Sequence, residues 1–518
     1  MTSGHLEIET KYDVGGDFEL PALDGLDGVA TVDPPVEHAL EAVYHDAADL
    51  RLLRARVTLR RRTGGPDAGW HLKLPAGAAR RELHAPLGRA VKKPPQALMA
   101  PVAGILRGAP TGPVATLRTR RVVTALRDDD GRLLAEVADD TVTATALAVE
   151  AGRPAEVHVW REVEVELGDG GPEDGAALAT AVGERLVAAG ARPSVSPSKV
   201  GRVLADRLNG DVAPPVKRKG GDTGPSAGEF VVAALREQLA RLEAADVLLR
   251  TEQPDAVHQV RVAARRLRST LAAFRAVLDK EATGSLREEL AWLGAQLAEV
   301  RDDEVALAHL SELVAAEPEE LVLGPVAARL QQSRLREEQA GLDRALQTVS
   351  EPRYLRLLDA VHDLVTAPPF TEQATGPVEP VLRDAVRRSV RRLRRHVRSA
   401  RRAAEEDRPE ALHAVRKAAK RVRYATEIAT SDLDGAADVV DAAKQIQQVL
   451  GDVQDTVVTR ELCRRFGVVA FAQGENAFTF GRLHALEQAR AERAVREFWK
   501  LEPTVRRVLK RAARQRGS

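Results

Sequence analysis

The sequence predicts an α+β protein of two domains, a strand-rich N-terminal domain and an all-α C-terminal domain. Residues 1–208 alternate polar and apolar side chains with a period of two, which is typical of strands. Residues 228–512 are rich in Ala, Leu, Arg and Glu and have helical periodicity. Residues 209–227, rich in Pro and Gly, are expected to be a linker. The 518 residues also exceed what one ordinary core holds.

The strands of the N-terminal domain are expected where the alternation is clearest. The expected strands are HLEIETKYDV from His5, LRARVTLRRRT from Leu53, GWHLKLP from Gly69, RRELHAP from Arg80, VATLRTRRVVTAL from Val114, RLLAEVADDTVTATAL from Arg132 and EVHVWREVEVEL from Glu156. Turn signals such as the Gly-Gly-Pro-Asp sequence at 64–67 separate them. Helices are expected around 96–106, 176–189 and 198–208.

The polar faces of these strands carry Glu-x-Glu patterns on two strands and Arg or Lys on four. An open sheet would place these charges in water, which is the ordinary situation of an alternating strand. A sheet closed into a barrel would have a charged interior instead, and a ligand would have to balance it. Carboxylates suit Mg²⁺ or Mn²⁺, and guanidinium and ammonium groups suit phosphate oxygens. The pattern therefore predicts a site for a metal-bound phosphate chain.

The first strand, with His5, Glu7, Glu9 and Lys11, resembles the opening strand of the CYTH domains, which are triphosphate tunnel metalloenzymes. The resemblance covers about residues 1–205 and continues through YHDAADLRLLRARVTLRRR, GWHLKLP, REVEVEL and a late Ser-Lys pair. It implies an antiparallel eight-stranded β tunnel with flanking helices. Members of this family hydrolyse inorganic triphosphate, thiamine triphosphate or RNA 5′-triphosphates, and some cyclise ATP. The family often has Asp-Thr where this chain has Asp46-Ala47.

The CYTH resemblance also implies roles for individual residues, with Mg²⁺ or Mn²⁺ as the cofactor. The implied metal ligands are Glu7, Glu9, Glu164 and Glu166. The implied catalytic residues are Glu7, Glu9, Lys11, Lys73, Glu162 and Glu164. The implied phosphate-binding residues are Arg60, Arg62, Lys73, Arg118, Arg120 and Lys199. Asp139 and Asp140 are adjacent, so the alternation leaves open which of them faces the interior.

The helical domain contains an internal repeat. The segment DAVHQVRVAARRLRS begins at Asp255, and EALHAVRKAAKRVRY begins 155 residues later at Glu410. Further along, LAEVRDDEV at Leu297 resembles LGDVQDTVV at Leu450. On a helix, His258, Arg261, Arg265 and Arg268 of the first segment lie on one face and its apolar residues on the opposite face. Two related helical halves are therefore expected to form one module.

Positive charge is concentrated in the second half of this module, although the net charge of the whole chain is only +1. The stretch from Arg383 to Arg423 holds 16 basic and five acidic side chains. Such a concentration suggests an anionic partner, and a solvated helix surface is the plainer alternative. Only 3% of the residues are aromatic, which argues against base stacking on single-stranded nucleic acid.

The repeated basic segments, with WLGAQLAEVRD and LGDVQD, resemble the CHAD domain over about residues 228–510. CHAD domains bind inorganic polyphosphate, and CYTH–CHAD fusions are a known architecture. The resemblance therefore implies tripolyphosphate and long-chain polyphosphate as partners. The implied polyphosphate-binding residues are His258, Arg261, Arg265, Arg266, Arg268, His413, Arg416, Lys420, Arg421 and Arg423.

Taken together, these features lead us to expect metal-dependent hydrolysis of inorganic tripolyphosphate in the tunnel and polyphosphate binding by the helical module. The alternatives are a non-catalytic polyphosphate binder, an enzyme acting on an organic triphosphate such as thiamine triphosphate or ATP, and binding of nucleic acid or heparin through the Arg-rich helices. No run of 18 apolar residues predicts a membrane span. The N-terminal sequence lacks an apolar signal core and Cys463 is the single cysteine, so we expect a cytoplasmic protein associated with polyphosphate granules.

Overall fold

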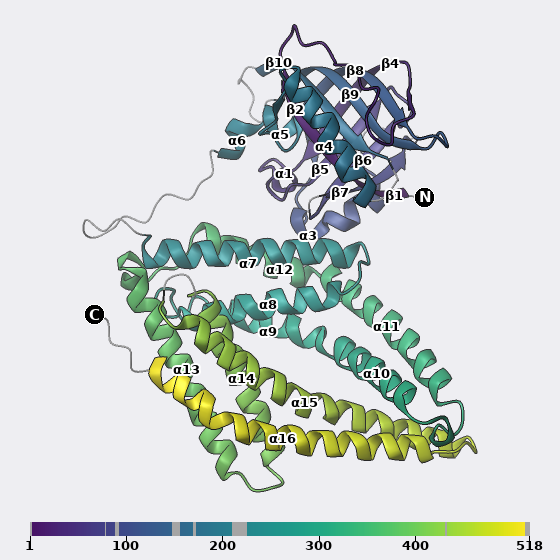
Figure 1. The fold of residues 1–518 in the computed structure, drawn as a ribbon. Helices are drawn as coiled ribbons and strands as arrows, with labels where there is room; N and C mark the ends of the chain where they lie inside the picture. The colour runs from purple at the N-terminus through teal and green to yellow at the C-terminus, as the bar shows by residue number, and fades with distance from the viewer. Residues whose placement is uncertain are drawn as a thin grey trace. The chain divides into compact units, whose positions relative to one another are not determined.

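The computed structural model describes residues 3–77, 79–88, 93–147, 156–168, 172–209, 225–429 and 433–512. The chain divides into two compact units, Met1–Val212 and Ala213–Ser518 (Figure 1). The first holds an antiparallel sheet with short helices, and the described residues of the second form helices. The predicted fold class is therefore confirmed. Most of the expected linker, residues 210–224, lies outside the described residues.

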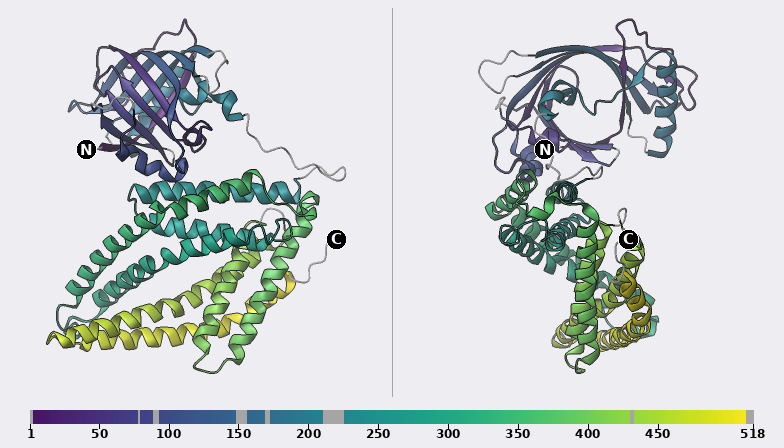
Figure 2. Two further views of the ribbon diagram at one scale, coloured as in Figure 1. Left: turned by 180° about the vertical axis from the view of Figure 1, so that it is seen from behind. Right: turned by 90° about the vertical axis from the view of Figure 1, so that its left-hand side faces the viewer.

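The sheet of the first unit closes into a barrel because its first strand pairs along both edges. The beginning of this strand, β1 (Ser3–Glu7), pairs with β7 (Ala79–Pro86). Its continuation, β2 (Glu9–Val14), pairs with β10 (Glu156–Leu167). From β7 the order runs β6, β5, β4, β8, β9 and β10, all antiparallel. The ring of strands is visible in the right-hand view of Figure 2.

With β1 and β2 counted as one strand, the barrel has the eight long strands that were expected. The remaining strands are β3 (Thr31–Val32), β4 (Val36–Asp46), β5 (Thr58–Thr63), β6 (Gly69–Ala76), β8 (Gly112–Arg127), β9 (Leu133–Ala146) and β11 (Arg192–Pro193). The two-residue strands β3 and β11 pair with β8 and β2 outside this ring order. A closed barrel separates an inner from an outer face, which an open sheet would not do.

Helices cover parts of the barrel wall. The longest, α4 (Pro172–Ala188), packs Val182 and Leu186 onto apolar side chains of β2, β9 and β10. A Cβ atom at Gly183 would lie 2.1 Å from the hydroxyl oxygen of Tyr12, so the close approach of α4 to β2 requires glycine there. The shorter helices are α1 (Arg51–Arg54), α2 (Gln96–Met99), the 3₁₀ helix η1 (Ala100–Val102), α3 (Ala103–Leu106), α5 (Lys199–Val203) and α6 (Ala205–Asn209).

One strand was missed, and one expected strand was placed too early. Strand β4 was not predicted, because its sequence VEHALEAVYHD spaces apolar residues more like a helix than a strand. The strand expected from Leu53 begins only at Thr58, because α1 and a turn at Arg56 (φ 59°) come first. The carboxylate of Asp46 holds the start of α1 by accepting the backbone N–H groups of Ala47, Leu52 and Leu53. Asp46 therefore has a structural role similar to a helix cap.

The second unit is a bundle of long helices. Its bounds are α7 (Ala227–Arg250), α8 (Ala256–Ala273), α9 (Gly284–Gln296), α10 (Ala298–Ala316), η2 (Glu319–Leu321), α11 (Val326–Ser350), α12 (Pro352–Thr366), η3 (Glu372–Thr375), α13 (Val378–Arg402), α14 (Arg408–Glu427), α15 (Ala436–Ala472) and α16 (Phe478–Ala512). The two repeated basic segments form α8 and α14, which pack against each other. The second repeated motif lies in α10 in the first half of the repeat and in α15 in the second half. In the first half the helix is interrupted at Leu297, between α9 and α10, whereas in the second half α15 is continuous.

Apolar stripes hold the bundle together as the helical periodicity predicts. On α8 the buried residues include Val260, Leu267 and Leu271, and on α13 they include Val390 and Leu393. These stripes belong to the main core, and a second core joins α10, α11, α15 and α16, where Cys463 is buried. Within the described ranges, no helix has an apolar stretch long enough to cross a bilayer.

Replacing Leu267 by Ala should lower the free energy of unfolding of the helical unit by about 2–5 kcal/mol, because the side chain is fully buried on α8 and its loss leaves a cavity. Chemical denaturation followed by circular dichroism at helical wavelengths measures this change. Leu335→Ala on α11 is the matched control, since Leu335 is 54% exposed and should cost little. Equal effects of the two substitutions would contradict the packing of α8.

Candidate functional site

The barrel encloses a charged cavity of about 300 Å³. Nine of the predicted site residues line it: Glu7, Glu9, Lys11, Arg60, Arg62, Lys73, Glu164, Glu166 and Lys199. The predicted residue Glu162 is buried beside it on β10 and contacts Lys199. The strand alternation therefore places acidic and basic side chains on the same inner wall, as the closed-barrel interpretation required.

Lys199 lies at the centre of a group of buried carboxylates. Its ammonium nitrogen is 2.6 Å from Glu164 Oε1, 2.7 Å from Glu162 Oε1 and 3.0 Å from Asp140 Oδ2. Burial alone would lower the pKa of Lys199, but these three carboxylates outweigh burial and raise it, so the side chain stays charged. The same carboxylates offer atoms within 4.8 Å of one another, close enough to hold one cation. In this structure the Lys199 ammonium group supplies that positive charge.

Helix α5 places Lys199 in this position. Ser198 is its N-cap, and the Ser198 hydroxyl oxygen accepts the N–H of Gly201 at 3.0 Å. Val200 and Val203 then pack against Leu117 and Val142 in an apolar cluster of the barrel wall. The late Ser-Lys pair thus combines a helix cap with a buried cation.

A second group of charges surrounds Lys73. Its ammonium group contacts Glu7 and lies 3.1 Å from Glu82 Oε2. Burial would lower the pKa of Lys73, and Arg60 adds to this, but Glu82, Glu7 and Glu9 raise it overall. Lys73 therefore remains an ammonium group that faces the cavity.

Glu7 and Glu166 are less completely neutralised than the carboxylates around Lys199. The Glu7 Oε2 atom is buried and has no hydrogen-bond partner among the described residues. Burial, and then the Glu7 carboxylate, raise the pKa of Glu166 to about 7. An unsatisfied carboxylate oxygen beside a second carboxylate fits a hard divalent cation. The predicted ligands Glu7 and Glu166 thus have the chemistry of a metal site, whereas Glu164 already contacts Lys11, Lys199 and Arg121.

Arg118 and Arg120 were predicted to face the interior, and this was wrong. Their side chains are 80% and 61% exposed and pair with Glu41 and Glu37 on the outer wall. Arg121 faces the interior instead, where it contacts Asp140 at 2.6 Å and Glu164 at 2.5 Å. Alternation says which residues share a face but not which face is inside, and the consecutive arginines at 120 and 121 gave no signal to decide it.

The adjacent aspartates are now distinguished. Asp140 is fully buried in the interior group, and Asp139 pairs with Arg161 at 2.6 Å on the opposite face of β9. The lining residues that the sequence interpretation did not name as site residues include Tyr44, Arg80, Glu82, Arg121 and Glu136. Tyr44 lies on β4, the strand that was not predicted, so its inward position could not be inferred.

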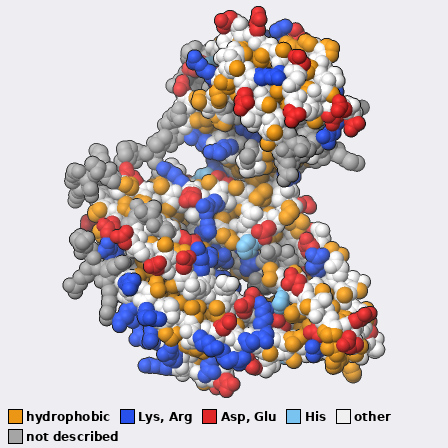
Figure 3. Space-filling view, in the orientation of Figure 1, with side chains coloured by type: hydrophobic (Ala, Val, Ile, Leu, Met, Phe, Trp, Pro, Cys, Tyr) orange, Lys and Arg blue, Asp and Glu red, His pale blue; other side chains and the backbone are white. Residues whose placement is uncertain are grey.

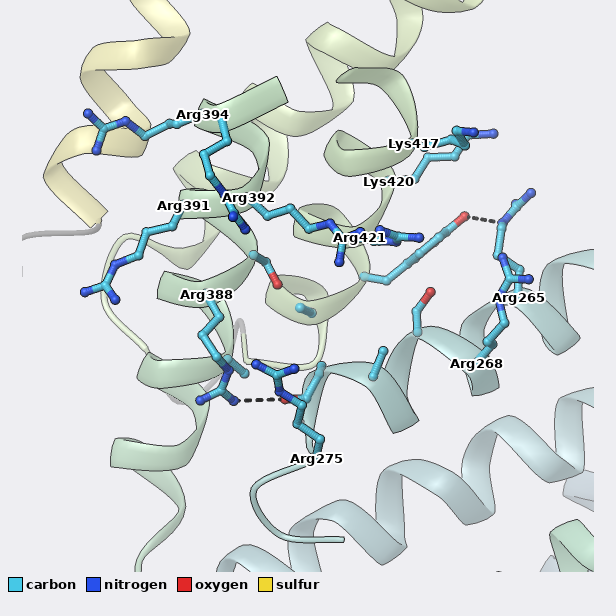
Figure 4. A pocket seen from close by; sticks show the side chains of 18 of the residues that line it. Arg265, Arg268, Arg275, Arg388, Arg391, Arg392, Arg394, Lys417, Lys420 and Arg421 are labelled. Atoms are coloured by element: carbon cyan, nitrogen blue, oxygen red, sulfur yellow. Dashed lines mark hydrogen bonds between the residues drawn. The ribbon is translucent and has the colours of Figure 1, made fainter. Parts of the chain in front are cut away.

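The helical unit has a separate basic pocket of about 770 Å³. Three helices, α8, α13 and α14, supply most of its cations, and Figure 4 shows the labelled side chains that come from them. The basic lining residues are Arg265, Arg268, Arg275, Arg287, Arg388, Arg391, Arg392, Arg394, Arg395, Arg398, Lys417, Lys420 and Arg421. No acidic side chain occurs among the described residues of this lining. Lys and Arg side chains are abundant over the helical unit in Figure 3.

Four predicted polyphosphate-binding residues line this pocket, namely Arg265, Arg268, Lys420 and Arg421. The other six lie on α8 and α14 outside its lining: His258, Arg261, Arg266, His413, Arg416 and Arg423. The largest contribution that was not assigned to the binding site comes from α13, which adds six arginines. The concentration of positive charge from Arg383 to Arg423 includes this helix, but the predicted binding residues lie only in the repeated segments, which form α8 and α14.

Tyr424 holds several of these cations in place. Its hydroxyl oxygen accepts the Nε–H of Arg265 at 2.9 Å, and the guanidinium carbons of Arg265, Arg266 and Arg423 lie 4.8–5.9 Å from its ring centre. Nearby, burial and then Arg416, Arg265, Arg423 and Arg261 lower the pKa of Lys420 to about 7. Arg266 and Arg423 share one carboxylate, Glu427, at 4.0 and 3.2 Å, and the remaining excess of positive charge favours an anionic ligand.

Replacing Arg121 by Ala should destabilise the tunnel unit by about 3 kcal/mol, because it removes a buried partner of Asp140 and Glu164 while Lys199 still contacts both. Arg118→Ala, three positions away on the outer wall, should cost about 0–1 kcal/mol. Differential scanning calorimetry compares the two variants. A larger loss for Arg118→Ala would show that the inner and outer faces of β8 have been exchanged.

Comparison with known proteins identifies both units. The CYTH domain model matches residues 5–186, and the CHAD domain model matches residues 233–464. An uncharacterized protein of Mycobacterium tuberculosis, found in two strains, is 38% identical over 524 residues, which covers 99% of this chain and 98% of the relative.

Two solved structures are also similar. PptA from Streptomyces chartreusis is 23% identical, covers 54% of this chain and 99% of its own, and has a TM-score of 0.45. The CHAD domain of the plant Ricinus communis is 24% identical, covers 58% of this chain and 97% of its own, and has a TM-score of 0.41. On the evidence of the two domain matches and the relative that aligns along almost its whole length, the chain belongs to the family of proteins that carry a CYTH domain followed by a CHAD domain.

Proposed function

We propose that the tunnel hydrolyses inorganic tripolyphosphate with a divalent metal ion, and that the helical unit binds inorganic polyphosphate. The observation that carries the first part is a closed barrel whose interior holds carboxylates and cations together. Cations alone would suit any anion, and carboxylates alone would suit any metal ion. Both in one cavity suit an anion that arrives with a metal ion, as polyphosphates do.

Glu7, Glu9, Glu164 and Glu166 would hold Mg²⁺ or Mn²⁺ in this proposal, and the unsatisfied Oε2 atom of Glu7 is the point of best fit. When bound, the ion supplies charge neutralisation and polarisation of phosphoryl oxygens. The group around Lys199 differs, because its three carboxylates already surround an ammonium group. Lys199 would balance the charges of Asp140 and Glu162, whereas Glu164 would have to exchange its contact with Lys199 for the metal ion.

The cations of the wall would bind and orient the phosphate chain. Lys73, Arg60 and Arg121 contact or face carboxylates of the cavity and can exchange them for phosphate oxygens. In hydrolysis a water oxygen bonds to a terminal phosphorus, the bridging P–O bond breaks, and the leaving diphosphate keeps the bond's electron pair. Fixed cations beside the bridging and leaving oxygens stabilise the charge that develops there. The barrel wall limits access of bulk water to this site.

The lining of the cavity favours an inorganic chain over an organic triphosphate. Among its described lining residues, Tyr44 is the only Phe, Tyr or Trp, and its side chain hydrogen-bonds Arg60. A nucleotide base or a thiamine ring would therefore find few apolar surfaces to stack on. Fourteen of the other 21 lining residues are Asp, Glu, Lys or Arg, which suits a ligand made entirely of phosphate.

The pocket of the helical unit supports polyphosphate as its ligand for a similar reason. Its cations come from three helices and have no acidic neighbour in the described lining. The ring of Tyr424 is 3% exposed and surrounded by arginines, so it offers no platform for a nucleic-acid base. A flexible chain of phosphates can contact all three walls without needing a base-binding surface.

Glu7→Gln should lower the rate of tripolyphosphate hydrolysis by about 100-fold, because it removes a charge from the proposed metal site and leaves the volume unchanged. The measurement is phosphate release from tripolyphosphate with Mg²⁺ or Mn²⁺. Glu41→Gln is the matched control, since Glu41 pairs with Arg118 on the outer wall and should leave the rate unchanged.

Equal rates for Glu7→Gln and the unmodified protein would remove Glu7 from the site. No hydrolysis by the unmodified protein with either metal ion would favour a non-catalytic polyphosphate binder. Faster turnover of thiamine triphosphate, or cyclic AMP formation from ATP, would favour the organic-triphosphate alternatives.

Polyphosphate binding by the helical unit should weaken as the pH rises above about 7. Burial, and then the arginines at 416, 265, 423 and 261, lower the pKa of Lys420 to about 7. A bound polyanion raises this pKa, so binding takes up a proton above pH 7 and the Kd increases by up to about tenfold per pH unit. Calorimetric titration of long-chain polyphosphate between pH 6 and 9 measures this trend. Lys420→Arg should flatten it, and an unchanged slope would exclude Lys420 as its source.

A further inference from the structure

The hairpin between β5 and β6 brings an acidic residue to the tunnel cavity. Its turn residues Gly64 and Gly65 have φ angles of +78° and +75°. A Cβ atom at Gly64 would lie 2.1 Å from the carbonyl oxygen of Ala39, so the turn packs closely against β4. Pro66 and Asp67 follow and line the cavity. The turn is therefore fixed in a position that presents Asp67 to the interior.

Asp67 pairs with Arg62, one of the predicted phosphate-binding residues. The Arg62 side chain is 9% exposed, whereas the Asp67 side chain is 49% exposed. The backbone also holds Asp67, because its carbonyl oxygen lies 3.0 Å from His71 Nε2 on β6. The carboxylate thus reaches a buried guanidinium group from the solvent side of the cavity.

Arg62 has few other counter-charges. Burial, and then the positive charges of Arg60 and Arg121, lower its pKa to about 9. Arg60 and Arg62 are two residues apart on β5, so Arg62 lies about 7 Å closer to the hairpin at the usual rise of a strand. A phosphate chain that extended from Arg60 towards the hairpin would meet Arg62 next, and there it would compete with the Asp67 carboxylate.

We propose that Asp67 is a specificity-determining residue, a built-in competitor for Arg62 that limits how many phosphates the tunnel accepts. This inference rests on the proposed function of the tunnel. A chain of three phosphates is held by Lys73, Arg60 and Arg121, and Asp67 keeps its place on Arg62. A fourth phosphate has to displace the carboxylate, which makes tetrapolyphosphate the poorer ligand.

Asp67→Asn tests this, because it keeps the shape of the side chain and removes its charge. Calorimetry on the full chain compares imido-bridged analogues of tripolyphosphate and tetrapolyphosphate, which resist hydrolysis, in the presence of Mg²⁺. The substitution should tighten binding of the four-phosphate analogue by about tenfold and of the three-phosphate analogue far less. Glu41→Gln on the outer wall changes the net charge equally and should alter neither. The helical unit is identical in both variants, so its contribution cancels in the comparison.

Equal tightening for both analogues, or no tightening, would overturn the proposal. The tighter binding of the four-phosphate analogue should also require Arg62, so the double variant Asp67→Asn, Arg62→Gln should not show it. Tighter binding by the double variant would also contradict the proposal. Hydrolysis of tripolyphosphate measured in parallel separates the two ideas. If the protein does not hydrolyse tripolyphosphate but Asp67→Asn still tightens binding of the four-phosphate analogue, the competitor role of Asp67 stands. The proposed hydrolase activity is then excluded.

Discussion

The buried contact between Lys199 and the carboxylates of Asp140, Glu162 and Glu164 is the constraint on which the tunnel depends. Placing three carboxylates inside a barrel is costly unless opposite charge lies within contact distance. The chain meets this requirement with a late helix that is capped by Ser198 and anchored by Val200 and Val203 in the barrel wall. Local capping, apolar packing and electrostatics therefore act together at one short segment. The interior that results can hold fixed charges of both signs without a ligand and can exchange partners when a ligand enters.

The two units arrange their charges in different ways. In the tunnel nearly every cation is paired with a carboxylate, and Glu7 and Glu166 leave negative charge unbalanced. That arrangement suits a ligand carrying its own divalent ion. In the helical pocket the cations from α8, α13 and α14 have no such partners in the described lining, so a polyanion can bind there by charge alone. One chain thus combines a site suited to chemistry on phosphate chains with a site suited to holding them.

Much of this could be predicted from the sequence, because period-two alternation and the 155-residue repeat report directly on strands and on paired helices. The phase of β8 could not be predicted. Arg118 and Arg120 share a face, but only pairing with β4 and β9 shows that Arg121 is inside. Strand β4 was missed because its apolar spacing is helical, and its inward Tyr44 was missed with it. The arginines of α13 were visible as a charge run, but their meeting with α8 and α14 depends on tertiary packing. Asp67 looked like an ordinary turn residue, and only the folded hairpin brings it to Arg62.

The central claim is that a metal ion and a phosphate chain complete the charged interior of the barrel. Anomalous diffraction from crystals of the full chain grown with Mn²⁺ and an imido-bridged triphosphate tests it most directly. The account predicts a manganese peak within bonding distance of the Glu7 carboxylate, with phosphate oxygens on Lys73, Arg60 and Arg121. Manganese and phosphate found only outside the barrel, with the contacts of Lys73 and Arg121 to their carboxylates unchanged, would contradict it.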